Sequence, residues 1–92
     1  MNEHKVEELH FLDGSVYISP NKMDRDPNKI IKDGLREENK SPVYLKLRDG
    51  LFSHKAVIFS DISKDEANQK AQTLVDFYKI KGREVLNEKV MA

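Results

Sequence analysis

Alternating polar and apolar positions near the start of the chain predict a β-hairpin. The runs Val6–Leu12 and Ser15–Ser19 flank Asp13-Gly14, a pair that favours a two-residue type I′ turn. A loop of this length pairs His10 with Tyr17 across the two strands. Because side chains alternate along a strand, one face is expected to carry Leu9, Phe11, Val16 and Ile18, and the other Glu8, His10 and Tyr17.

The next segment predicts a short helix. Asp26 followed by Pro27 is a favourable helix start, because the carboxylate accepts hydrogen bonds from free N–H groups and proline has no N–H to satisfy. Gly34 is suited to end the helix in a left-handed conformation; if Gly34 is tolerated inside it, the helix extends to about Asn39. Pro42 prevents the helix from continuing further.

A second hairpin is expected from Val43–Leu47 and Leu51–Ser60. The first run alternates apolar and polar residues, and Asp49-Gly50 supplies a turn. The loop can contain two or three residues, which leaves the register of this hairpin open. The four consecutive apolar residues at 56–59 predict a strand covered on both faces, and therefore central in its sheet.

A long helix follows. The pattern Ser63-x-x-Glu66 is a capping box, and it predicts a helix to about Lys81 that Gly82 ends. One face of this helix carries Ala67, Ala71, Leu74, Val75 and Tyr78. Apolar residues between Val85 and Met91 leave room for a last short strand. The expected order is β-β-α-β-β-α-β, a single small α+β domain over residues 1–92, with a mostly antiparallel sheet and the long C-terminal helix packed on one face.

Length and composition agree with one small domain. The chain has 92 residues, and this length is too short for two independent cores. Of these residues, 38% are hydrophobic and 35% are charged. The longest unbroken apolar stretch, Ala56–Phe59, is far below the ~20 residues of a membrane-spanning helix. The charged start has no apolar leader region and the chain has no cysteine, so we expect a cytoplasmic protein.

No residue pattern indicates an enzyme. The histidines His4, His10 and His54 lack the helical spacing of a metal site, and glycine-rich phosphate loops and nucleophile elbows are missing from the sequence. Ser53 and His54 are adjacent, so on a strand they would point to opposite faces without a hydrogen bond. We therefore expect no catalytic residues, no metal and no cofactor.

By elimination, the sequence favours a small binding protein. Its formal net charge is zero, and an excess of three positive charges between Asn21 and Phe59 is too mild to select nucleic acid. We expect stoichiometric protein–protein interaction, as an adaptor or inhibitor, with His10 and Tyr17 as candidate contact residues. The composition suits a bacterial or phage accessory protein.

The alternative is a nucleic-acid-binding module. β-ribbon proteins place two strands in a groove of DNA, and lysines on such strands neutralise phosphates. The basic face of the predicted second hairpin would supply the contacts Tyr44, Lys46, Arg48, His54 and Lys55.

Overall fold

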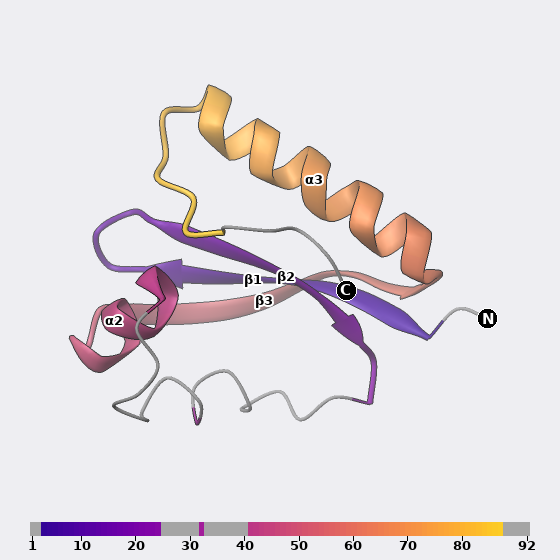
Figure 1. The fold of residues 1–92 in the computed structure, drawn as a ribbon, viewed down its shortest axis with the longest axis horizontal. Coiled ribbons are helices and arrows are strands. Elements are labelled where there is room, and N and C mark those ends of the chain that lie inside the picture. Colours follow the sequence, from indigo (N-terminus) through magenta and orange to yellow (C-terminus); the bar gives the residue numbers. More distant parts are fainter. Residues whose placement is uncertain (1–2, 25–31, 33–40, 88–92) are drawn as a thin grey trace.

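The computed structural model describes residues 3–24, 32 and 41–87 (Figure 1). Five helices and strands lie within these residues. They are β1 (His4–Phe11), β2 (Val16–Lys22), α2 (Pro42–Arg48), β3 (Phe52–Ile62) and α3 (Lys64–Ile80). The strands form an antiparallel sheet of order β2-β1-β3. The α+β class is confirmed, whereas the expected order of seven elements is not. The helix predicted from Pro27 lies outside the described residues, apart from Lys32.

Helix α3 forms as its capping signal predicts. The Ser63 hydroxyl accepts a hydrogen bond from the Glu66 N–H at 3.1 Å, and Lys81 caps the other end. Gly82 follows with φ of +78°, the left-handed conformation that ends many helices. The expected apolar face is also confirmed, since Ala67, Ala71 and Val75 are buried and Leu74 and Tyr78 pack beside them.

The first hairpin is confirmed, but its predicted register is wrong by one residue. His10 lies opposite Val16 rather than Tyr17, so the loop contains three residues instead of two. Gly14, the last residue of this loop, has φ of +88°, and its N–H donates to the Phe11 carbonyl at 3.0 Å. A three-residue loop needs only this one left-handed residue, whereas a type I′ turn needs two.

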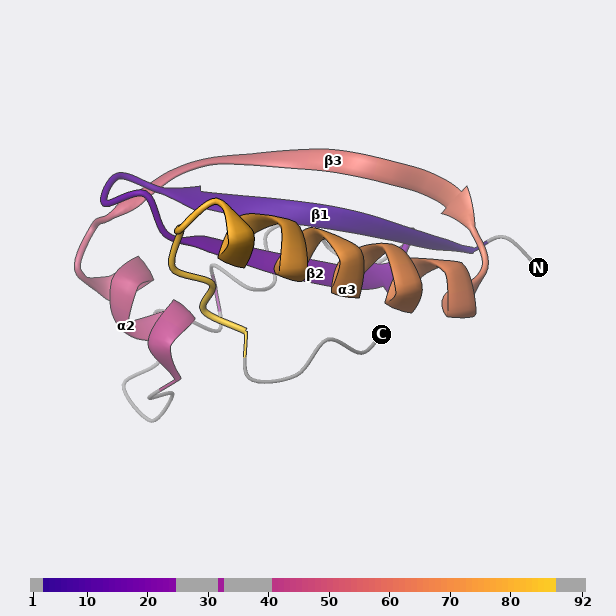
Figure 2. The ribbon, with the colours of Figure 1, turned by 90° about the horizontal axis from the view of Figure 1, so that it is seen from above.

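The shifted register places apolar residues on both faces of the sheet. Val6 and Ile18 face α3, whereas Leu9 and Phe11 face α2. One core cluster contains Val6, Ile18, Ala67, Ala71 and Val75, and the other contains Leu9, Phe11, Val43, Leu47 and Leu86. Each face is apolar where a helix packs on it: α3 runs along one face, and α2 lies at the end of the sheet near the first loop (Figures 1 and 2).

The first strand of the predicted second hairpin is instead helix α2. Ser41 takes the N-cap position and Pro42 begins the first turn, where its missing N–H costs nothing. Val43 and Leu47 are buried one turn apart, while Leu45 between them is 46% exposed. The alternation of apolar residues suggested a strand, but Val43 and Leu47 are also four residues apart, which is the spacing that places two side chains on one face of a helix.

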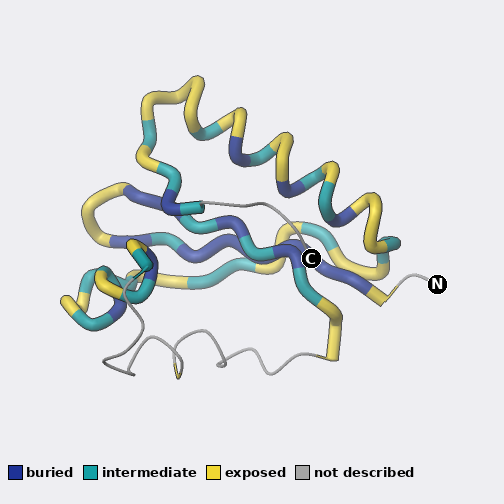
Figure 3. The backbone as a smooth tube through the Cα atoms, in the orientation of Figure 1, coloured by how far each residue is buried: buried dark blue, intermediate teal, exposed yellow. Residues whose placement is uncertain are grey.

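Strand β3 lies at an edge of the sheet, so the prediction of a central strand at residues 56–59 is wrong. Val57 is 54% exposed and Ile58 is 41% exposed. The central strand is β1, which is buried along nearly its whole length although five of its eight residues are charged or histidine (Figure 3). Its polar side chains can be buried because they have partners: Glu7, for example, pairs with Lys5 at 3.1 Å.

Residues 84–87 run beside β2 in place of the predicted last strand. Val85 forms a single parallel bridge with Val16, and residues 88–92 lie outside the described part of the chain. The Val16 N–H donates to the Glu84 carbonyl at 3.0 Å. Further along, the Asn87 side chain accepts from the Ile18 N–H and donates to the Ile18 carbonyl. This short segment therefore closes the outer edge of β2 from Val16 to Ile18.

Neither of the two described helices combines the length and the apolar character that crossing a bilayer requires.

Candidate functional site

Five polar side chains meet where the sheet passes under the end of α3. We call them the polar cluster: Glu8, His10, His54, Tyr78 and Arg83. At its centre is the buried carboxylate of Glu8, on β1. The Tyr78 hydroxyl lies 2.8 and 2.9 Å from the two carboxylate oxygens, and His10 Nε2 lies 2.9 Å from Oε1. The carboxylate is therefore hydrogen-bonded by groups from both β1 and α3.

Tyr78 is held as a hydrogen-bond donor by its surroundings. Burial, together with the hydrogen bond and negative charge of Glu8, raises the pKa of Tyr78 to about 12, against a smaller opposite effect of Arg83. The Arg83 guanidinium lies 5.0 Å from the centre of the Tyr78 ring, and its Nε donates to the Gly14 carbonyl at 2.8 Å. Arg83 thus joins the segment after α3 to the first loop.

Two histidine rings stack across the sheet on the same side. His10 and His54 are cross-strand neighbours, with ring centroids 4.6 Å apart and ring planes within 2° of parallel. Arg83 Nη2 lies 3.4 Å from His10 Nδ1. A neutral His10 that donates from Nε2 to Glu8 and accepts at Nδ1 satisfies all of these partners, and we assign this tautomer from them. The exposed His54 forms the outer layer of the stack.

The polar cluster contains residue types that perform acid–base catalysis, but their groups are occupied by one another. Tyr78 and His10 both use the Glu8 carboxylate as their acceptor, and the His10 side chain is only 15% exposed. Such an arrangement stabilises the contact between β1, β3 and α3. Within residues 3–24 and 41–87, no group of three or more His, Asp or Glu side chains is arranged to hold a metal ion.

This cluster was not predicted from the sequence. Tyr78 lies on the apolar face of α3, as predicted, but a buried tyrosine hydroxyl also needs a hydrogen-bond partner. Glu8 and His10 stand two residues apart on a strand, and this spacing places them on one face. Together, those two signals could have pointed to a polar contact between the strand and the helix.

The predicted protein-binding residues are not neighbours. His10 belongs to the polar cluster beside α3, whereas Tyr17 lies opposite Leu9 and packs with the core cluster beside α2. The expected placement of both on one outer face is therefore wrong, because it depended on the two-residue loop.

The residues of the nucleic-acid alternative also do not form one hairpin face. Tyr44, Lys46 and Arg48 belong to α2, and His54 and Lys55 are adjacent on β3. Lys46 is ion-paired with Asp13, and it lies 3.7 Å from Glu84; Lys55 lies 3.3 Å from Glu7. Two of the proposed phosphate contacts thus already have carboxylate partners.

Asp13 is strongly affected by its ion pair. The Lys46 ammonium and the Ser15 hydroxyl hold the pKa of the Asp13 carboxyl well below its usual range, and the same pair raises the pKa of Lys46. Asp13 therefore remains charged at any mildly acidic pH and connects the first loop to α2.

Ser53 and His54 do contact each other, contrary to expectation. The Ser53 hydroxyl lies 3.1 Å from His54 Nδ1. The cause is a β-bulge: the register shifts between His10 and Phe11, so Ser53 has no partner residue on β1 and its side chain departs from strict alternation.

The outer edge of β3 has no strand beside it among the described residues, and we call its part from His54 to Ile58 the open edge. Pairing with β1 is regular from His54 to Val57, between bulges at Ser53 and Ile58. Seen from above, α3 crosses over β1 and β2 and leaves β3 to one side (Figure 2). The open edge carries the half-exposed apolar side chains of Val57 and Ile58.

One side of α3 borders this edge, and we call it the basic flank: Lys70, Phe77 and Lys81. Lys70 Nζ lies 4.6 Å from the ring centroid of Phe59, a β3 residue, which shows that this side of the helix faces β3. Phe77 stands about two turns further along the same side. Its ring is 49% exposed, and Lys81 Nζ lies 5.4 Å from the ring centroid.

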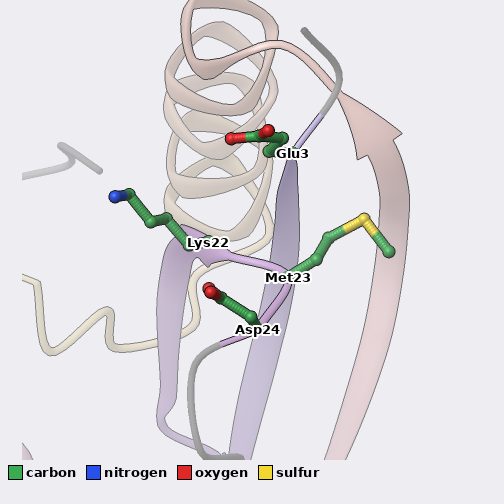
Figure 4. Close-up of a pocket in the computed structure, with 4 residues that line it drawn as sticks. All are labelled: Glu3, Lys22, Met23 and Asp24. Carbon is green, nitrogen blue, oxygen red and sulfur yellow. The ribbon is translucent and has the colours of Figure 1, made fainter.

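A pocket of about 340 Å³ lies at the other end of the sheet (Figure 4). Among the described residues, its walls are Glu3, Lys22, Met23 and Asp24. Met23 is fixed from two directions, since its N–H donates to the Glu3 carbonyl and its Sδ accepts from the Asp61 N–H at 3.3 Å. None of the predicted site residues lies in this pocket.

The chain was compared with protein-family models, curated proteins and solved structures, and no match was found in any of the three.

Proposed function

We propose that this protein acts by stoichiometric binding to a protein partner, as an adaptor or inhibitor, without catalytic turnover. The observation that supports it most strongly is the exposure of Val57, Ile58 and Phe77 around the open edge. Large apolar side chains that border an unpaired strand favour contact with another protein, because association removes their surface from water. As part of the same proposal, the protein works in the cytoplasm.

The remaining polar chemistry supports the same proposal. Glu8, His10 and Tyr78 are engaged with one another in the polar cluster, so they stabilise the fold on which the open edge is presented. The open edge also replaces the predicted binding residues as the best candidate surface, because the largely buried His10 offers little contact area.

The test is an affinity purification of the tagged protein from lysate of the source organism, in parallel with two variants. Val57→Ser and Phe77→Ser remove apolar side chains at the open edge, and Leu45→Ser is the matched control, because Leu45 is similarly exposed but lies on α2. We expect one protein to be recovered in a fixed molar ratio with the wild type and with the control, and to be reduced in both variants.

A nuclease-treated sample distinguishes the nucleic-acid alternative. Recovery that disappears after nuclease treatment would favour that alternative, whereas an unchanged protein band supports the present proposal. Substrate turnover by the purified protein, or no stoichiometric protein partner in any sample, would contradict the proposal.

A further inference from the structure

The open edge has the geometry that β-strand addition uses. In an antiparallel pair, backbone N–H and C=O groups point alternately toward the partner strand and away from it. Because His54–Val57 pairs regularly with β1, every second residue of this run directs its backbone groups outward. Val57 is one of these residues, and among the described residues no backbone group pairs with its outward N–H and C=O, so a partner strand could bond them.

The basic flank gives the edge a charge preference. In the described part of the chain, neither Lys70 nor Lys81 is paired with a carboxylate; each ammonium instead lies over an aromatic ring, of Phe59 or Phe77. An ammonium over a ring face keeps donors available for an anion. A partner at the open edge would therefore meet two cations on the side of α3, with the apolar Phe77 ring between them.

We propose that the open edge and the basic flank together bind an extended, acidic segment of a partner protein, which adds as a strand to β3. Its carboxylates would lie on the α3 side, near Lys70 and Lys81, and its apolar side chains on the opposite side of the sheet, near Val57. The inference rests on the proposed function and names the site and the class of partner for it. Main-chain hydrogen bonds supply affinity in this binding mode, and side chains supply specificity.

Two other occupants fit the edge less well. The phosphate groups of a nucleic-acid backbone accept hydrogen bonds but donate none, so they would leave the outward carbonyl groups of β3 unsatisfied. A second copy of this chain could pair antiparallel through β3, but the two-fold symmetry would bring the basic flank of one copy against that of the other. The two pairs of ammonium groups would repel each other.

The test uses a short synthetic peptide in which valine and glutamate alternate, with a valine–lysine peptide of the same length as its charge-reversed control. Binding is followed by NMR titration of the isotope-labelled full chain. We expect the valine–glutamate peptide to shift the amide resonances of His54–Val57 and Phe77, and to bind at least about tenfold more tightly than the lysine peptide, a difference of about 1.4 kcal/mol.

Charge reversal on the protein provides the decisive comparison. In the Lys70→Glu/Lys81→Glu double variant, the preference should change in favour of the valine–lysine peptide. Lys79→Glu is the matched control, because Lys79 also lies near the end of α3 but about 160° around the helix from Lys81, and it should leave the preference unchanged. Thermal unfolding of each variant verifies that the fold is retained.

Several results would overturn the inference. These are failure of the valine–glutamate peptide to bind, equal binding of both peptides, a preference that survives charge reversal, and a dimer of this chain that shields the amides of β3. Failure of the proposed function would be seen separately, as the lack of any stoichiometric protein partner in the lysate purification. A partner recovered equally by the wild type and the double variant would overturn only this inference.

Discussion

The two edges of the sheet differ in how far other described residues pair with their backbone. At β2, residues 84–87 cover the outer backbone from Val16 to Ile18, and the Asn87 side chain bonds both the N–H and the carbonyl of Ile18. At β3, the described residues supply no such cover, although natural proteins usually protect long edge strands. The bulges at Ser53 and Ile58 shorten the regular part of this edge, which limits non-specific pairing. On our proposal, the β2 edge serves stability and the β3 edge serves binding.

Each edge strand carries an isoleucine, and the losses of stability on replacing the two should differ more than in any other comparison below. Ile18 on β2 is completely buried under α3, whereas Ile58 on β3 is 41% exposed. We expect Ile18→Ala to lower the free energy of unfolding by about 3 kcal/mol, because it leaves a cavity in the core. Ile58→Ala should cost at most about 1 kcal/mol. Chemical denaturation measures both, and equal losses would contradict the contrast between the edges.

Removing the Tyr78 hydroxyl should have the next largest effect. Tyr78→Phe leaves the buried Glu8 carboxylate without its hydroxyl donor, so we expect a loss of about 2 kcal/mol at neutral pH. Tyr44→Phe, which alters a tyrosine of α2 outside the polar cluster, is the control and should change stability much less.

The stabilisation by the Tyr78 hydroxyl should also decrease at alkaline pH. The pKa of Tyr78 is raised to about 12 in the folded state, above the value of about 10 in the unfolded chain. The stabilisation by the Tyr78 hydroxyl is therefore complete below pH ~10 and is lost as the pH rises from ~10 to ~12. The stability difference between wild type and Tyr78→Phe should therefore shrink in that range. Chemical denaturation across that range measures the difference, and a constant value would contradict the assigned hydrogen bond.

How far the sequence could predict these features depended on whether local signals agreed. Ser63, Glu66 and Gly82 all supported α3, and its apolar face had the helical period, so this element was predicted almost to the residue. Residues 43–47 satisfied a strand pattern as well as the i, i+4 spacing of α2, and only tertiary burial of Val43 and Leu47 distinguishes the two. The first hairpin failed in register because an Asp-Gly pair fits both loop lengths.

The open edge and the polar cluster were harder to predict. Hydrophobicity suggested that residues 56–59 were central, while the true central strand β1 carries charged residues whose partners are distant in sequence, such as Tyr78 for Glu8. The spacing of Glu8 and His10 and the hydroxyl of Tyr78 were signals of a polar contact, but no local pattern identifies these residues as partners of one another. The candidate site therefore emerged from strand order and not from any motif.

Asn87 should have a smaller, more local effect. Asn87→Ala removes both side-chain bonds to Ile18, and we expect a loss of about 1 kcal/mol with faster exchange of the Ile18 amide. Gln69→Ala changes an exposed amide side chain on α3 and should affect neither quantity. If the Ile18 amide exchanges as slowly in Asn87→Ala as in the wild type, the side chain does not close that edge.

The smallest expected effect is the acid response of Asp13. Because its folded pKa is depressed, the stabilisation by this carboxylate is present above the unfolded pKa of about 4 and is lost as the pH falls below that value. The melting temperature of Asp13→Asn should be lower than that of wild type at neutral pH, and the two should converge in acid. Asp49→Asn, at the end of α2, serves as the control. A difference that persists unchanged in strong acid would contradict the ion pair with Lys46.

Amide hydrogen exchange of the free protein, measured by NMR, tests the contrast between the edges most directly. The outward amides of β2, Val16 and Ile18, donate to Glu84 and Asn87, so they should exchange slowly. On β3, the Val57 amide points away from β1 and should exchange rapidly, whereas the Ala56 amide points toward β1 and should exchange slowly. Uniformly slow exchange across His54–Val57, equal to that of Ile18, would contradict the account, because it would mean that the edge of β3 is already occupied.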